Sequence, residues 1–315
     1  MAVQLHVAFS KTFSKGAGII AGGPYLCANS SIQTAIGRCM QNKEQIPLTE
    51  LVEITRSWGS EGKIDSLSFL ASSRVYLFSS TGDIFVNQTV MDDLKKYYQH
   101  FISADNIYYK NDINFAHAFI TDNYGNPCRE TKPPFLNNCG YDTAGHMLEF
   151  IYGKLNPRNT GELLGKLIEF NQRQFTTIPT MGATGFVYVP STCRSGQNTF
   201  LCKVVVALHG CQQNKDQIED VFARHAGYNE WADTNDMVVL YPQTSVHAFN
   251  GCWDWWGATG SDYAQQSGVQ MKAIKAMLDH LSTIQPSGET TCYSISLLVM
   301  GISLIASFLQ MAYEF

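Results

Sequence analysis

A mostly parallel, doubly wound α/β sheet is the fold that the sequence predicts, and three observations indicate it. Residues 204–208 form an unbroken apolar run that His209 and Gly210 end, as is typical of a strand buried on both faces of a parallel sheet. A helical stretch to about residue 232 separates this run from a second apolar strand at 236–243. An aromatic loop at 250–257 and a helix over 267–281 complete the alternation of such sheets.

The first half of the chain shows a similar alternation of apolar runs, amphipathic stretches and turn-rich loops. In order, we expect a buried helix (1–13), a short central strand with a glycine-rich turn (16–24), a mostly helical polar region (28–66), a strand that ends at Asp83 (73–83), an amphipathic helix (90–101), a short apolar segment around His117, a loop (123–138), a helix (142–152), a peripheral linker with a helix (155–180) and an edge strand (185–190).

Composition excludes some classes of function. The 315 residues are 16% charged, carry a net charge of −5 and contain no basic run, so nucleic-acid binding is not expected. With 12% aromatic residues, the chain is suited to a neutral or apolar substrate. We expect no cofactor, no metal and a monomer.

Nine cysteines predict disulfides rather than a metal site. Three close pairs lie in polar loops, and the sequence has no Cys-x-x-Cys motif: Cys27 with Cys39, Cys128 with Cys139, and Cys193 with Cys202. Disulfides imply an oxidising compartment, whereas residues 1–9 do not form a signal peptide. Together with the odd number of cysteines, this predicts an incomplete N-terminus.

Candidate catalytic groups follow the predicted strands. The loop that begins at His209-Gly210 is either an ordinary turn or part of an oxyanion hole made by backbone N–H groups. Asp83 and His117 follow in the order acid then histidine, as in hydrolytic triads. The alternative roles are a helix cap or turn former for Asp83 and a structural histidine for His117.

The nucleophile is not evident, because the chain contains no Gly-x-Ser-x-Gly motif. The nearest match places Ser303 between Gly301 and Ile305, and a β-branched side chain would crowd such a tight turn.

Cys211 lies in the loop that begins at His209-Gly210, and Cys252 lies in the aromatic loop. A disulfide between them is a better interpretation than a nucleophilic thiol, since it would join the His-Gly loop to the aromatic loop. In that loop, Trp253, Trp255 and Trp256 form either a substrate-facing shelf or ordinary packing.

The chain resembles the secreted poly(3-hydroxybutyrate) depolymerase family in its circularly permuted form, over about residues 1–282. The motifs that carry the resemblance include Leu-His-Gly-Cys-Gln-Gln at 208–213 and Gly-Cys-Trp-Asp-Trp-Trp-Gly at 251–257. Others lie at residues 1–5, 21–25, 79–83, 87–94, 116–118, 124–128 and 226–229.

The resemblance implies a circularly permuted α/β-hydrolase, located outside the cell or in the periplasm, that hydrolyses 3-hydroxyalkanoate esters through an acyl-enzyme. Asp83 would orient His117, His117 would act as general base and acid, and the Cys211 N–H would hold the oxyanion. Trp253 and Trp255 would line the groove for the polyester, the expected partner.

Two departures from the family pattern shape the expectations. Family members read Gly-Leu-Ser-x-Gly-x-(Phe/Tyr)-Met-Ala-Val-Gln, so the nucleophile and its strand are expected upstream of Met1. We expect residues 1–282 to form one domain and residues 283–315 to be a divergent hydrophobic tail, whose part at 293–313 is frameshifted sequence or a membrane anchor. The run at 295–302 has one further option, which is to occupy the vacant central strand position and bring Ser303 to the turn.

The alternatives to an active esterase are an inactive relative that binds polyester or oligomers, and a membrane-tethered form.

Overall fold

The computed structural model describes residues 1–193, 202–284 and 295–300. Its α-helices are α1 (Ala2–Ala8), α2 (Ile32–Gly37), α3 (Leu48–Ser60), α4 (Gln88–Gln99), α5 (Thr143–Tyr152), α6 (Lys215–Ile218), α7 (Val221–His225), α8 (Tyr228–Thr234) and α9 (Val269–Ile284). Its strands are β1 (Gly16–Ile20), β2 (Arg74–Phe78), β3 (Ile107–Lys110), β4 (Phe119–Thr121), β5 (Asn126–Pro127), β6 (Leu136–Asn138), β7 (Lys166–Asn171), β8 (Thr184–Val189), β9 (Lys203–Leu208), β10 (Met237–Tyr241) and β11 (Ile295–Met300).

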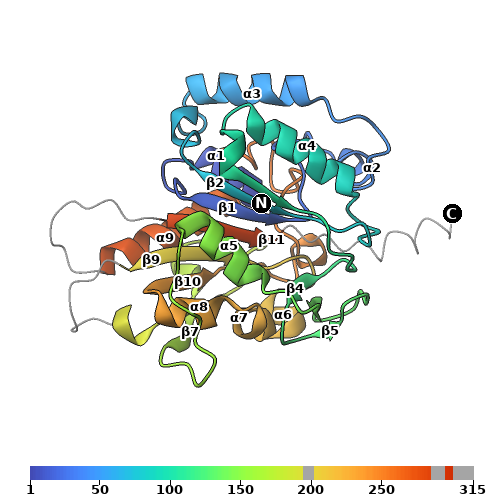
Figure 1. Ribbon diagram of the computed structural model, residues 1–315. Coiled ribbons are helices and arrows are strands. Elements are labelled where there is room, and N and C mark those ends of the chain that lie inside the picture. The colour runs from blue at the N-terminus through green and yellow to red at the C-terminus, as the bar shows by residue number, and fades with distance from the viewer. Residues whose placement is uncertain (194–201, 285–294, 301–315) are drawn as a thin grey trace.

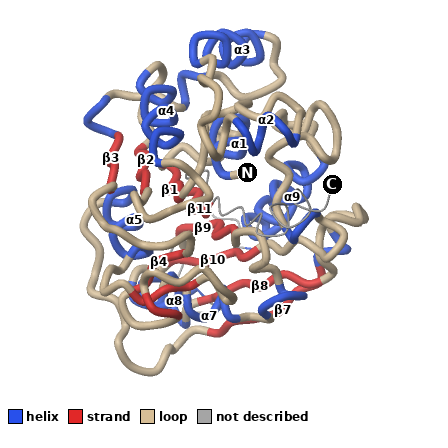
Figure 2. Tube along the Cα trace, turned by 90° about the vertical axis from the view of Figure 1, so that its right-hand side faces the viewer, coloured by secondary structure: helices blue, strands red, loops and turns tan. Residues whose placement is uncertain are grey.

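The main sheet has eight strands in the order β3-β2-β1-β11-β9-β10-β8-β7 (Figure 1). The six strands from β3 to β10 pair in parallel, whereas β8 and β7 add an antiparallel hairpin at one edge. Figure 2 shows α1 and α9 on one side of the row of strands and α5 and α8 on the other. The protein therefore has the mostly parallel, doubly wound sheet that the sequence predicts.

The apolar run that ends at His209 forms β9 in the centre of this sheet. Residues Val205 to Leu208 are at most 1% exposed, and β9 pairs in parallel with β10 on one side and β11 on the other. The residues of such a strand need not alternate between apolar and polar, because helices cover both of its faces.

The central strand position, expected to be vacant, is filled by β11. Ile19 of β1 is in register with Val299, and Leu208 of β9 is in register with the same residue. A strand from the predicted tail thus occupies the central position expected to be vacant, which was the topological option for the run at 295–302. Ser303 and the rest of the tail beyond residue 300 lie outside the described residues.

Two edge assignments from the sequence are wrong. The segment 155–180, expected to be a linker with a helix, contains strand β7, and β8 is not an edge strand because it pairs with both β7 and β10. Leu167 and Phe170 of β7 are half-buried, and its other four residues, the apolar Ile168 among them, are exposed. That weak contrast gives no clear period-two signal in the sequence.

Residues 1–13 do not form one helix. α1 ends at Ala8, and the chain then turns before it enters β1. All seven residues of α1 are nevertheless buried, because the helix packs on β1 and β11. Within the described parts of the chain, no helix is both long and apolar enough to cross a bilayer.

Candidate active site

The segments with candidate catalytic residues meet at one edge of the sheet. Parallel strands β1, β2 and β9 all end there, and the segments at 21–28, 79–86 and 209–213 follow them. Ligand sites of open α/β sheets lie outside the carboxyl ends of the strands for this topological reason.

Asp83 and His117 form a buried hydrogen-bonded pair. Nδ1 of His117 lies 2.7 Å from Oδ2 of Asp83, and the two side chains are 0% and 4% exposed. Nε2 of His117 has no hydrogen-bond partner among the residues that the structure describes, although it is buried. An imidazole whose Nδ1 is held by a carboxylate and whose Nε2 is open can take a proton from a neighbouring hydroxyl.

The Asp83 carboxylate is itself oriented by the backbone. Oδ1 accepts hydrogen bonds from the N–H groups of Phe85 (2.8 Å) and Val86 (2.9 Å), which leaves Oδ2 for the imidazole. Asp83 therefore does form a turn, as the alternative interpretation held, but only one of its two oxygens is used for it.

His117 is positioned by a small second sheet of strands β4, β6 and β5. The chain enters β4 two residues after His117, and the Ala116 N–H donates to the carbonyl of Cys128 at 3.0 Å. Cys128 is disulfide-bonded to Cys139, which follows β6 directly. The disulfide thus closes the sheet that supports the histidine.

The loop after β9 is ordered by a network of buried side chains. Nδ1–H of His209 donates to the Gly210 carbonyl (2.6 Å), and its Nε2 accepts from the Thr244 N–H (3.2 Å). Oε1 of Gln213 accepts from the Gly210 N–H (2.8 Å), and its Nε2 donates to the Phe135 carbonyl (3.1 Å). The loop is therefore held rigidly beside Cys211, and His209 is a neutral structural histidine with both ring nitrogens occupied.

Two buried histidines predict a loss of stability in acid. Burial lowers the pKa of His6 to about 3 and that of His209 to about 4, from 6.5. Below pH 6.5 these histidines bind protons in the unfolded chain but not in the folded one. Each residue should therefore lower the free energy of unfolding by up to about 1.4 kcal/mol per pH unit between pH 6 and its folded pKa, with no effect above pH 7. Urea unfolding at several pH values measures this slope, which should be shallower in His6→Leu; an equal slope would contradict the assignment to His6.

Cys211 and Cys252 form a disulfide between the loop after β9 and the aromatic loop. The remaining pairs expected from the sequence are also bonded: Cys27 with Cys39, Cys128 with Cys139, and Cys193 with Cys202. The ninth cysteine, Cys292, lies outside the described residues.

The Cys211–Cys252 disulfide is expected to contribute strongly to stability, because it closes a long loop. With a separation of 41 residues, the chain-entropy model gives about 4 kcal/mol at 25 °C. Urea unfolding of Cys211→Ala/Cys252→Ala should show a loss of this order. The matched control is Cys193→Ala/Cys202→Ala, whose separation of 9 residues gives about 2.6 kcal/mol in the same model. A larger loss in the control would contradict the entropic interpretation.

The aromatic loop is built around Asp254. Its carboxylate accepts hydrogen bonds from the N–H groups of Gly257, Ala258 and Thr259 at 2.8–2.9 Å and from the Thr259 hydroxyl at 2.6 Å. Because these bonds join Asp254 to the end of the loop and to the two residues that follow it, Asp254 shapes the loop and is not available as a catalytic acid.

The three tryptophans of this loop have different environments. Trp253 is 4% exposed and donates from Nε1 to the His209 carbonyl at 3.0 Å, and it lines the pocket described below. Trp255 is half-buried and also lines that pocket. Trp256 does not line it; its ring packs at 6.0 Å from that of Phe249 and 5.5 Å from that of Trp255. The Trp256 ring therefore packs against its aromatic neighbours and does not face this pocket.

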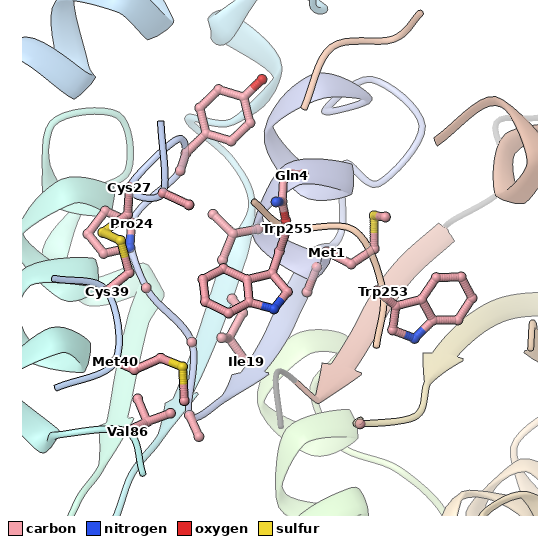
Figure 3. A pocket seen from close by; sticks show the side chains of 18 of the residues that line it. Met1, Gln4, Ile19, Pro24, Cys27, Cys39, Met40, Val86, Trp253 and Trp255 are labelled. Carbon is pink, nitrogen blue, oxygen red and sulfur yellow. A yellow bond between two sulfur atoms is a disulfide. The ribbon is translucent and has the colours of Figure 1, made fainter. Parts of the chain in front are cut away.

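A pocket of about 70 Å³ lies between these loops and the start of α1 (Figure 3). Trp255 stands in its middle above Ile19, with Cys27, Cys39, Met40 and Val86 on one side and Met1 and Trp253 on the other. His209, Gly210 and Cys211 complete the wall at the end of β9. The pocket is thus apolar and bordered by the candidate oxyanion loop.

The pocket adjoins the acid–histidine pair. Val86 lines the pocket and also donates its N–H to Asp83, and the Phe85 ring lies 5.3 Å from that of His117. Residues 21–28, Met40 and Val86 form a wall of the pocket that the sequence does not predict. The glycine-rich turn after β1 is the sequence signal for this wall, because glycines, which have no side chains, let the backbone come close to a site.

Known proteins similar to this chain come from one group of enzymes. The family model described as Esterase PHB depolymerase matches residues 187–291. The chain is 51% identical over 292 residues to a poly(3-hydroxybutyrate) depolymerase of Delftia acidovorans, covering 92% of this chain and 58% of that relative. It is 40% identical over 290 residues to a polyhydroxybutyrate depolymerase of Talaromyces funiculosus, covering 87% of this chain and 84% of that one.

Two solved structures have the same fold. One is the crystal structure of PHB depolymerase from Penicillium funiculosum, and the other is a serine-to-alanine variant of a PHB depolymerase complexed with an R3HB trimer. Each has a TM-score of 0.80 and 39% sequence identity, and the match covers 86% of this chain and 88% of the solved one. The chain therefore belongs to the PHB depolymerase esterase family, with an α/β-hydrolase fold.

Proposed function

We propose that this protein hydrolyses the ester bonds of poly(3-hydroxybutyrate) and related 3-hydroxyalkanoates by a serine-esterase mechanism. The observation that carries the proposal is the buried His117, whose Nδ1 is held by Asp83 and whose Nε2 has no partner in the described part of the chain. The family relatives, one of them complexed with an R3HB trimer, support the class of substrate.

In this mechanism His117 takes the proton of a serine hydroxyl as the serine oxygen attacks the ester carbonyl carbon. Asp83 keeps the imidazole in the tautomer with hydrogen on Nδ1 and stabilises the imidazolium. The backbone N–H of Cys211 stabilises the oxyanion, and the imidazolium then donates its proton to the leaving alcohol. Water, activated by His117, hydrolyses the acyl-enzyme and releases the 3-hydroxy acid.

Trp253 and Trp255 line the pocket and would bind the methyl-bearing backbone of the polyester. Their indoles offer apolar area to a neutral chain that has few hydrogen-bond donors. The four disulfides support an extracellular or periplasmic location, since such bonds persist in oxidising compartments.

We place the serine on a segment upstream of Met1 in a longer form of the protein. Met1, Ala2 and Gln4 line the pocket at the start of α1, and in this fold the nucleophile lies at the turn that leads into such a helix. Ser303 is the second candidate, since β11 occupies the strand position that would lead to it.

One observation favours a second function, namely binding of oligoesters without turnover. No hydroxyl of the described residues reaches Nε2 of His117, so the described part of the chain holds a base without its nucleophile. Removal of a triad serine leaves only about 10³–10⁴-fold acceleration over water.

The two functions are distinguished by incubating the protein with the linear trimer of (R)-3-hydroxybutyrate. Calorimetry measures binding, and chromatography measures the release of monomer and dimer. Hydrolysis that His117→Gln abolishes supports the esterase, and peptide mapping after fluorophosphonate labelling then identifies the serine. Binding without hydrolysis supports the second function, and absence of both contradicts the two proposals.

A further inference from the structure

We propose that Ser80 is a positioning residue that fixes the separation of Asp83 and His117. It does so by fastening the loop of the acid to the segment of the histidine. The predicted effect of Ser80 on hydrolysis rests on the proposed function. Its predicted effect on the orientation of His117 does not.

Ser80 lies two residues beyond the end of β2 and is 1% exposed. Its hydroxyl donates to the Phe115 carbonyl at 2.7 Å and accepts from the Phe115 N–H at 2.7 Å. It also accepts from the N–H of Gly82 at 2.9 Å. A serine hydroxyl has one donor hydrogen and two acceptor lone pairs. All three are therefore used: two hydrogen bonds join Ser80 to Phe115, which is far away in the sequence, and the third fixes the turn at Gly82.

The two segments also approach each other closely at Gly82, which has no side chain. A Cβ atom at Gly82 would lie 2.3 Å from Oδ1 of Asn114 and 2.8 Å from the Phe115 carbonyl oxygen. Such distances are not compatible with any larger residue unless the loops separate. Gly82 is thus required by the close approach of the loops.

The clamp formed by Ser80, Gly82 and Phe115 lies next to both members of the pair. Asp83 follows Gly82 directly, and His117 lies two residues after Phe115. The hydrogen bond from Nδ1 of His117 to Oδ2 of Asp83 therefore links the same two segments as the hydrogen bonds of Ser80 to Phe115, a few residues away. Together these contacts form a small closed ring of bonds. Because the ring is short, loss of the serine hydroxyl should change the orientation of the imidazole more than it changes the rest of the fold.

Ser79 provides a matched comparison. It is adjacent, 4% exposed and hydrogen-bonded, but its hydroxyl contacts the Tyr109 hydroxyl (2.7 Å) and Nε2 of Gln88 (3.2 Å). Neither partner belongs to the segment of His117. Ser79→Ala thus removes a buried hydroxyl from the same turn and leaves the clamp in place.

The test is NMR of protein with isotope-labelled histidine, which reports the tautomer of His117 independently of activity. The His117 signals are assigned by their loss in His117→Gln. In the wild type and in Ser79→Ala we expect hydrogen on Nδ1 alone. In Ser80→Ala we expect a mixture of tautomers and an exchange of the Nδ1 proton with solvent that is about tenfold faster or more. Ser80→Thr, which keeps the hydroxyl, should restore the wild-type signals.

Hydrolysis of the trimer gives the second readout. Ser80→Ala should lower kcat on the order of 10²-fold with KM nearly unchanged, because a small misplacement of a catalytic group has this effect. If the wild type hydrolyses nothing but Ser80→Ala still alters the tautomer, the proposed function fails and the positioning role stands. A folded Ser80→Ala with wild-type signals overturns the positioning role.

A third measurement covers the case in which Ser80→Ala does not fold. In the wild type, the amide hydrogens of Gly82 and Phe115 should exchange slowly with deuterium, since Ser80 accepts both of them. Exchange as fast as in an exposed loop would overturn the proposal.

Discussion

Asp83→Asn is expected to lower kcat for hydrolysis of the (R)-3-hydroxybutyrate trimer by about 10⁴-fold. The amide can donate to Nδ1 of His117, which reverses the tautomer and places the hydrogen on Nε2, where the proton of the nucleophile must be received. The geometry of the pocket should stay the same, so KM should change little. Initial rates measured by chromatography of the released acid check this.

Asp93→Asn is a suitable control for this substitution. Asp93 pairs with Lys96 on the surface of α4, and it does not contact the pair. Its loss should leave kcat unchanged. A decrease of less than about tenfold in Asp83→Asn would contradict the role of the carboxylate.

Leu298→Pro is expected to destabilise the protein by at least about 3 kcal/mol. Leu298 is at the centre of β11 and is in register with Gly18 of β1 and Ala207 of β9. Proline removes the backbone N–H at a position with strands on both sides, where a lost ladder bond leaves a buried carbonyl unpaired. Urea unfolding of the full chain measures the loss.

Leu298→Val separates the effect of the backbone from that of the side chain. Valine is well accommodated in strands, so its effect should stay below about 1.5 kcal/mol. Equal stabilities of the proline and valine variants would show that β11 does not pair in the sheet.

The elements that the sequence predicts well are those with a strong local signal. Apolar runs and periodicity predict β9 and the helix α9, and the structure has both. The order of Asp83 and His117 made them candidates only, and the structure shows that their side chains are hydrogen-bonded. Cysteine spacing was equally informative, because pairs 9–12 residues apart in polar loops have few alternative partners.

The features that local patterns do not predict depend on contacts between distant segments. The wall of the pocket is one of them, since residues 21–28, Met40 and Val86 come together only when the sheet has formed. The different environments of Trp255 and Trp256 are another such feature. Two adjacent tryptophans look alike in the sequence, which does not say which of them faces a pocket. β7 was missed because an exposed edge strand has little apolar contrast.

The position of β11 has a consequence for the order of folding. Among the described strands, β11 alone joins β1 to β9, and its residues are synthesised after both of them. These strands therefore form two separate parts of the sheet until residues 295–300 have left the ribosome. Contacts of such high sequence separation form slowly, and until then two central strand edges remain open to other chains. Aggregation during synthesis, rather than loss of the finished fold, is therefore the main hazard of this topology.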